Sequence, residues 1–186
     1  MRNVSRILPL LPGIAMLSGC NNAAQKSNGQ NDQKPNIIYI FADDLGIGDL
    51  SCYGATKVST PNIDRLAGQG VQFTNAYATS ATSTPSRFGL LTGMYPWRQK
   101  NTGIAPGNSE LIIDTACVTM ADMLKDAGYA TGAVGKWHLG LGPKGGTDFN
   151  KQITPNAQSI GFDYEFIIPA TVDLSLIHIS EPTRLR

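Results

Sequence analysis

One short stretch carries residues whose types and spacing suit chemistry on an anionic ester. Ser83 precedes Thr84 and Pro85, a pair that predicts a helix start because threonine caps helices and proline suits the first helical position. The free N–H groups and the dipole at a helix start favour an anion beside Ser83. Arg87 follows Ser83 by about one helical turn and can lean back toward the same end. The stretch predicts a site for a tetrahedral oxyanion ester, although an ordinary capped helix would use the same residues.

Two further pairs of polar residues each follow a predicted strand. Asp43 and Asp44 come directly after the apolar run 36–41, and adjacent carboxylates there suit either a hard divalent cation or a solvated turn. Lys136 and His138 follow a run of strand character, and in an extended segment their side chains point to the same side. An ammonium and an imidazole there suit an anion whose leaving oxygen needs a proton. A structural histidine beside a lysine is the alternative interpretation.

The elements that must position these residues alternate along the chain. Caps, proline, glycine and apolar spacing predict helices and strands. The expected helices run from Pro61 to Gly68 or Gly70, from Pro85 to Gly93, and from Thr119 to Gly128. The expected strands cover residues 36–41, a strand buried on both faces, then 71–77, 129–134 and an edge segment at 161–166. This order predicts an α/β fold with a doubly wound sheet, in which ligands bind at the carboxyl ends of the strands.

Three stretches of the chain resemble the signatures of the type I sulfatases. They are the run from Ser83 through Arg87 to Gly93, the run from Pro35 to Gly46, and Gly-Lys-Trp-His-Leu-Gly from Gly135 to Gly140. The resemblance extends to about Phe166. It implies the alkaline-phosphatase-like fold, the hydrolysis of sulfate esters, and sulfated glycans or small sulfate esters as substrates.

The resemblance also implies a role for each residue of the site. In this family the residue at the position of Ser83 is oxidised to formylglycine by a maturation enzyme. A hydrated aldehyde carries two hydroxyls, one to attack sulfur and one to expel sulfate, whereas a plain serine would remain sulfated. Calcium is expected at Asp43, Asp44 and the modified Ser83, with Arg87 steadying the aldehyde hydrate. Lys136 and His138 are then expected to hold the sulfate.

Two other functions remain open from the residues. A phosphatase or phosphodiesterase of the same superfamily would use Ser83 unmodified, usually with two metal ions. The single Asp pair, and His138 as the one histidine before residue 174, argue against it. A lipid-anchored glycan-binding protein with a degenerate pocket would not explain why Ser83, Arg87, Lys136 and His138 occur together.

The two ends of the chain are interpreted separately from the fold. Residues 1–20 resemble a bacterial lipoprotein signal that ends at a lipidated Cys20, and residues 21–34 form a polar tether. We therefore expect export and lipid anchoring in the periplasm or at the cell surface. Residues 174–186 resemble a translated sequencing adapter, which leaves 35–173 as the N-terminal part of a catalytic domain. Because the family's later metal ligands would lie beyond it, the fragment itself is expected to be inactive.

Composition and charge narrow the classes of partner. The 186 residues suffice for about one domain, and their formal net charge of +1 does not indicate nucleic-acid binding. The lipid anchor is the one expected contact with a membrane. Cys52 and Cys117 follow no metal-ligand spacing, and we expect two unpaired thiols.

Overall fold

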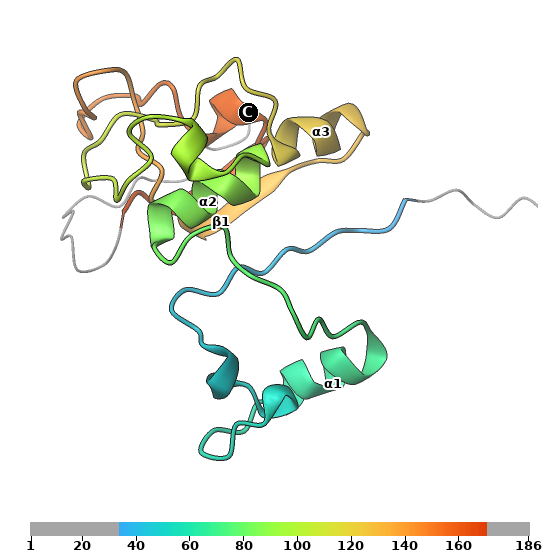
Figure 1. The fold of residues 1–186 in the computed structure, drawn as a ribbon. Helices are drawn as coiled ribbons and strands as arrows, with labels where there is room; N and C mark the ends of the chain where they lie inside the picture. Colours follow the sequence, from blue (N-terminus) through green and yellow to red (C-terminus); the bar gives the residue numbers. More distant parts are fainter. Residues whose placement is uncertain (1–33, 171–186) are drawn as a thin grey trace, which may run out of the picture. The chain divides into compact units, whose positions relative to one another are not determined.

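A computed structural model of the protein describes residues 34–170 (Figure 1). The expected signal peptide with Cys20, the tether up to residue 33 and the expected adapter tail lie outside the described residues. Within the described residues, 34–41 and 42–170 belong to two separate units. In order, the elements are η1 (Ile47–Asp49), η2 (Ser51–Tyr53), α1 (Pro61–Gln69), α2 (Ser83–Thr92), η3 (Pro96–Arg98), α3 (Met120–Asp126), β1 (Gly132–Lys136), η4 (Ala157–Ile160) and β2 (Tyr164–Ile168).

The sheet consists of β1 and β2, which pair in parallel. Gly132 lies opposite Tyr164 and Lys136 opposite Ile168. The pairing continues past β1, since the N–H of His138 donates to the carbonyl of Pro169 at 3.0 Å. Parallel neighbours joined through intervening segments, together with packed helices, confirm the expected α/β class.

Two of the expected strands do not form. Residues 36–41 are extended and exposed, with Ile38 84% exposed, and they are assigned to no sheet. Residues 71–77 also lie outside any strand, and Tyr77 is 88% exposed. An apolar run becomes a buried strand only where neighbouring strands supply hydrogen-bond partners, and residues 34–170 provide one two-stranded sheet. The expectation of a buried strand ahead of Asp43 is therefore wrong for the described residues.

Local signals place the helices closely. Helix α1 is bounded by Thr60 and Gly70 as expected, and α2 ends at Gly93, whose φ of 66° is the left-handed conformation that glycine adopts readily. In α3 the Thr119 side chain accepts a hydrogen bond from the Asp122 N–H, and Asp122 returns one, which forms a capping box. Short-range capping chemistry thus predicts both bounds of α1, the end of α2 and the start of α3.

The core gathers around α2 and the end of β1. Helix α2 contacts α3 and η3, and β2 contacts η4. The buried apolar cluster comprises Phe88, Leu91, Ile113, Trp137, Leu139, Leu141, Ala157, Ile160 and Ile167. The rings of Trp137 and Phe162 meet edge to face, with centroids 6.1 Å apart. Because two residues of α2 (Phe88 and Leu91) and three residues shortly after β1 (Trp137, Leu139 and Leu141) belong to one cluster, this core sets the position of both elements.

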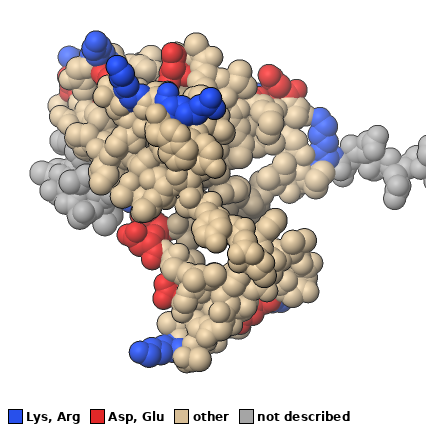
Figure 2. All heavy atoms as spheres, in the orientation of Figure 1, with Lys and Arg blue, Asp and Glu red and all other residues tan. Residues whose placement is uncertain are grey.

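The face seen in Figure 2 is mostly uncharged, with Lys and Arg interspersed among Asp and Glu. No helix among residues 34–170 combines the length and hydropathy needed to cross a bilayer. Cys52 and Cys117 are both free thiols, as expected.

Candidate functional site

Ser83 is the first residue of α2, and this differs from the predicted helix start. The N-cap is Thr82, in extended conformation, so that Thr84 and Pro85 stand inside the first turn. Thr84 does not act as the cap, and its buried side chain instead accepts a hydrogen bond from the N–H of Ala105 at 3.1 Å. Pro85 is tolerated because N–H groups in the first turn have no partner within the helix. Ser83 is therefore held at the positive end of α2.

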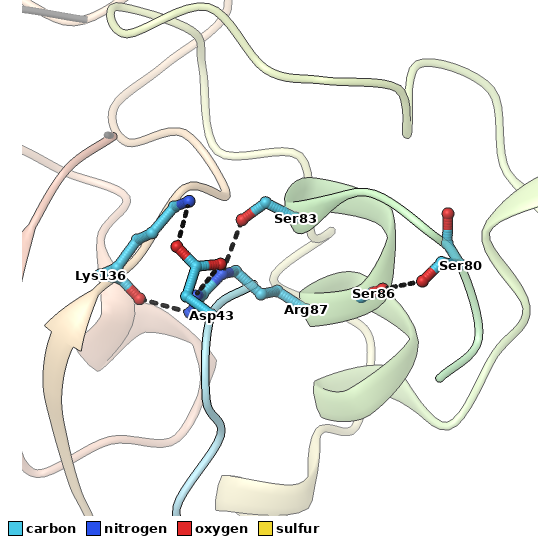
Figure 3. Close-up of polar contacts among 6 residues, drawn as sticks. All are labelled: Asp43, Ser80, Ser83, Ser86, Arg87 and Lys136. Atoms are coloured by element: carbon cyan, nitrogen blue, oxygen red, sulfur yellow. Dashed lines mark hydrogen bonds and ion pairs between the residues drawn. The ribbon is translucent and has the colours of Figure 1, made fainter. Parts of the chain in front are cut away.

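The Arg87 side chain joins the helix to the strand (Figure 3). Its Nε donates to Ser83 Oγ at 3.0 Å, which confirms the predicted approach across one helical turn. Its Nη1 donates to the carbonyl of Lys136, at the end of β1, at 2.6 Å. The side chain is 12% exposed, so these contacts are made largely out of water. A single guanidinium thus fixes the distance between the Ser83 hydroxyl and the carboxyl end of β1.

Asp43 completes a cluster of three charges in Figure 3. Its Oδ2 lies 2.7 Å from Lys136 Nζ and its Oδ1 lies 3.5 Å from Arg87 Nη2. The hydrogen bond from Lys136, and then the positive charges of Lys136 and Arg87, hold the pKa of Asp43 below its usual 3.8 despite some burial. Asp43 is therefore a carboxylate at neutral pH, and it anchors both cations.

Asp44 is exposed, next to this cluster in sequence, and has a left-handed backbone with φ of 54°. Within residues 34–170, no three side chains of His, Cys, Asp or Glu gather where a metal ion could be held. Calcium takes six to eight oxygen ligands. Asp43 and Asp44 offer the right kind of oxygen, and a complete coordination shell needs further ligands.

His138 is buried beside the cluster, with 3% of its surface exposed. Its Nε2 lies 3.0 Å from the carbonyl oxygen of Ala105, and its Nδ1 has no hydrogen-bond partner among the described residues. Burial lowers the pKa of His138, and the positive charges of Lys136 and Arg87 lower it further. The imidazole is therefore neutral at pH 7.

The predicted reason for pairing Lys136 with His138 is wrong. Side chains two residues apart share a face only in extended backbone, and His138 has a φ of 54°. Lys136 instead reaches Asp43, while His138 turns toward Ala105. The two side chains are close enough for the ammonium to affect the imidazole pKa, but the turn at His138, not strand alternation, places them.

Sequence reasoning missed Ala105 and Ser86. Ala105 acts through its backbone, with its N–H on Thr84 and its carbonyl near His138. The hydroxyl of Ser86 donates to the carbonyl of Ser80 at 2.6 Å and so ties the preceding loop to α2 (Figure 3). No side-chain pattern identifies Ala105, because every residue has the same backbone groups.

The assembled geometry suits an anionic tetrahedral ester. The Ser83 hydroxyl stands at a helix N-terminus, Arg87 and Lys136 supply positive charge, and a neutral His138 lies behind them. Asp43 offsets part of the positive charge and provides oxygen atoms for a cation. The structure brings together Ser83, Arg87, Lys136 and Asp43 through direct contacts, with His138 beside them.

Comparison with known proteins agrees with this geometry. The sulfatase family model matches residues 35–173. The chain is 91% identical over 173 residues to an N-acetylgalactosamine-6-O-sulfatase of Bacteroides thetaiotaomicron, covering 93% of this chain and 34% of the relative. This chain therefore spans about a third of that relative's length.

Solved structures are similar as well. One, described under the metabolism of multiple glycosaminoglycans by Bacteroides thetaiotaomicron, is 95% identical with a TM-score of 0.75, over 76% of this chain and 29% of that one. Another, Ps i-CgsB in complex with k-i-k-neocarrahexaose, is 36% identical with a TM-score of 0.63, over 75% of this chain and 29% of that one. Both likenesses extend over most of the described residues.

Proposed function

The chain belongs to the sulfatase family, and from that premise we propose that the full-length protein hydrolyses sulfate esters of sulfated glycans at Ser83. The observation that carries the proposal is the contact of Arg87 with Ser83 Oγ on one side and with the end of β1 on the other. The contact supports the proposal because it joins the proposed nucleophile position, at the N-terminus of α2, to the end of the strand that carries Lys136. Because this chain spans about a third of its curated relative, the 186 residues alone are expected to be inactive.

We propose that Ser83 acts after oxidation to formylglycine by a maturation enzyme of the host. The hydrated aldehyde supplies two hydroxyls on one carbon, which allows attack on sulfur and later release of sulfate. Arg87 supports this role because its Nε already donates to the side-chain oxygen at this position, at 3.0 Å. The same hydrogen bond would orient the side chain of the modified residue.

We propose that Asp43, Asp44 and the residue formed from Ser83 contribute oxygen ligands to calcium. Asp43 suits this role because its lowered pKa keeps the carboxylate ionised at neutral pH. Calcium would supply positive charge beside the reacting ester oxygens. Its remaining ligands must come from groups other than these three, since the described residues contain no larger cluster of acidic side chains and histidines.

Lys136 and His138 are the proposed contacts of the sulfate group. Lys136 supplies an ammonium at the carboxyl end of β1. His138 is neutral, and its Nε2–H donates to the carbonyl of Ala105, so Nδ1, which has no partner among the described residues, can only accept a hydrogen bond until the ring takes up a proton. The imidazole could give a proton to the leaving oxygen only after Nδ1 has itself taken one up, whereas Lys136 serves as a fixed charge.

The substrate and location are further parts of the proposal. The similar Bacteroides protein is named for N-acetylgalactosamine 6-sulfate, and we propose a sulfated amino sugar of this type as the substrate. We also propose export and lipid anchoring through Cys20, on the residues of the N-terminal segment.

The decisive experiment combines mass spectrometry with activity. Full-length protein from its native host is digested, and the peptide spanning Ser83 is expected to have lost two hydrogen atoms. The same protein should hydrolyse 4-nitrophenyl sulfate, and Ser83→Ala should abolish that activity by removing the covalent step. An active protein with unmodified Ser83 and a preference for phosphate esters would identify a phosphatase instead. A correctly folded protein that binds glycans without hydrolysing either ester would identify a binding protein.

Calcium binding is tested by thermal unfolding of the full-length protein. At a hundredfold excess over Kd, a bound ligand stabilises by about 2.7 kcal/mol. Calcium should raise the melting temperature of the wild type, and Asp43→Ala and Asp44→Ala should each remove most of that increase. Asp148→Ala, which removes an exposed carboxylate paired with Lys151, is the matched control and should retain it. An equal increase in all variants would place the calcium site elsewhere.

A further inference from the structure

A pocket of about 480 Å³ is lined in part by Ala105, the residue whose carbonyl contacts His138, and is not used by any role assigned above. It is formed by the loop 101–112 together with Gly145 and Gly146. Its volume falls within the range of small-molecule sites, which is roughly 300–1,000 Å³. Residues 101–112 contain no helix or strand, and long connections without secondary structure in compact domains are often functional.

The pocket is held in place by backbone hydrogen bonds. The N–H of Leu141 donates to the carbonyl of Ser109 at 2.9 Å, and the N–H of Leu111 donates to the carbonyl of Gly142 at 3.1 Å. Gly140, with φ of 69°, permits this approach, since a methyl group there would overlap the Glu110 backbone. The wall formed by residues 109–111 is therefore fixed before any ligand arrives.

Ala105 connects the pocket to the proposed sulfate site. It lines the pocket and is itself 5% exposed. Its N–H donates to the side chain of Thr84, the residue after Ser83, and its carbonyl lies 3.0 Å from His138 Nε2. One residue of the pocket wall thus contacts both the residue after Ser83 and His138, which connects the wall of the pocket to the proposed sulfate site.

The lining of the pocket has the chemistry of a neutral, hydroxyl-rich ligand. Its polar side chains are the amides of Asn101 and Asn108, the hydroxyl of Ser109 and the carboxylate of Glu110, while Ile104 adds an apolar surface. Ser109 Oγ is buried and has no hydrogen-bond partner among the described residues. No Lys or Arg is among the described residues that line it. Amides and hydroxyls pair with sugar hydroxyl and acetamido groups, whereas an anionic ring would meet Glu110 without a compensating cation.

We propose that this pocket binds a neutral sugar ring of the sulfated glycan, directly beside the sulfate group. The inference rests on the proposed sulfatase function and assigns its sugar-recognition residues. Asn101 and Asn108 hydrogen-bond the ring substituents, and Ile104 covers an apolar face of the ring. The pocket therefore selects neutral hexoses or N-acetylhexosamines over uronates.

The test compares two substrates in the full-length protein. N-acetylgalactosamine 6-sulfate carries the sugar, and 4-nitrophenyl sulfate lacks it. In Asn108→Ala the ratio of kcat/KM for the sugar sulfate to that for the aryl sulfate should fall about tenfold, which corresponds to the loss of one hydrogen bond. Asn101→Gly should act in the same direction, and glycine suits that position because Asn101 has a φ of 64°. Asn150→Ala removes an exposed amide outside the pocket and should leave the ratio unchanged.

Direct sugar binding separates this inference from the proposed function. Saturation-transfer NMR should detect unsulfated N-acetylgalactosamine on the wild type and on Asn150→Ala, with the signal reduced in Asn108→Ala. If neither sulfate ester is hydrolysed but this pattern of binding holds, the proposed sulfatase function fails and the sugar pocket stands. Equal binding by all three proteins, an unchanged substrate ratio in both pocket variants, or stronger binding of glucuronate than of N-acetylgalactosamine would overturn the pocket. A comparison of N-acetylgalactosamine 6-sulfate with a sulfated disaccharide then tells whether the sulfated ring or its neighbour occupies the pocket.

Discussion

Helices α1 and α2 have similar local sequences and very different surroundings. Each has a threonine at the N-cap, a proline in the first turn and a glycine directly after the last residue. Helix α2 nevertheless buries six residues, namely Thr84, Pro85, Ser86, Phe88, Gly89 and Leu91, whereas α1, all of which is described, buries none. Local signals therefore decide that a helix forms, and they do not decide whether it belongs to a core.

The difference matters for the site because α2 holds the nucleophile position. Phe88 and Leu91 pack with Trp137 and Leu139, so the helix that carries Ser83 and the segment that carries His138 share one core. The carboxylate side of the site has no such support. Asp43 is 42% exposed and is held by its ion pairs to Lys136 and Arg87. Core packing therefore positions Ser83 and His138, whereas ion pairs position Asp43.

The largest expected effect is the loss of stability when a large side chain of α2 is truncated, compared with the same kind of truncation in α1. Phe88→Ala in α2 should lower the free energy of unfolding by about 3–5 kcal/mol, because Phe88 is fully buried and its removal leaves a cavity. Leu66→Ala in α1 should change it by no more than about 0.5 kcal/mol, because Leu66 is 62% exposed. Urea denaturation of the chain measures both. Equal losses would show that α1 is packed as tightly as α2.

A matched pair of glycine substitutions should give effects of opposite sign. Gly89→Ala in α2 should destabilise by about 1–3 kcal/mol, because the new methyl group would overlap the side chain of Thr79. Gly68→Ala in α1 meets no atom within 4 Å and should stabilise by about 0.5–1 kcal/mol through its higher helix propensity. Thermal unfolding of the two variants against wild type provides the measurement. Stabilisation by Gly89→Ala would mean that Thr79 can move away and that α2 is packed less tightly.

The smallest expected effect is the pH dependence of stability. The two regions should lose stability in different pH ranges, because different groups titrate in each. Burial puts the folded-state pKa of His138 below 6.5, so the unfolded chain binds a proton that the folded chain does not. Stability is complete above pH 6.5 and falls as the pH drops toward the folded pKa. In α1, Asp64 has its pKa lowered from 3.8, chiefly by a hydrogen bond from Ser51, so the stability from that carboxylate is lost only below about pH 4.

Unfolding measured between about pH 7 and pH 5 tests this difference. The wild type should lose stability over that range, and His138→Gln should flatten the dependence because glutamine does not titrate. Asp64→Asn should leave the slope in that range unchanged. A slope that persists in His138→Gln would assign the titration to another group.

Features that depend on residues close together in the sequence were predictable, and features that depend on distant residues were not. The bounds of α1, the glycine that ends α2 and the capping box of α3 were all predictable, since each depends on residues a few positions apart. The strands at 36–41 and 71–77 were not, because a strand forms only against partners that its own sequence does not contain. The start of α2 was misplaced because Thr82, not Thr84, is the N-cap, and the hydroxyl of Thr84 instead accepts a hydrogen bond from Ala105, 21 residues away.

The identities of Ser83, Arg87, Lys136, His138 and the Asp pair, and the family they indicate, were determined by the sequence alone, because chemistry-bearing side chains and their short spacings are written directly in it. Tertiary structure alone decided that Lys136 meets Asp43 across 93 residues, that His138 is buried and neutral, and that Ala105 both lines a pocket and contacts His138. Ion pairs, desolvation and backbone contacts depend on neighbours that only the folded chain brings close.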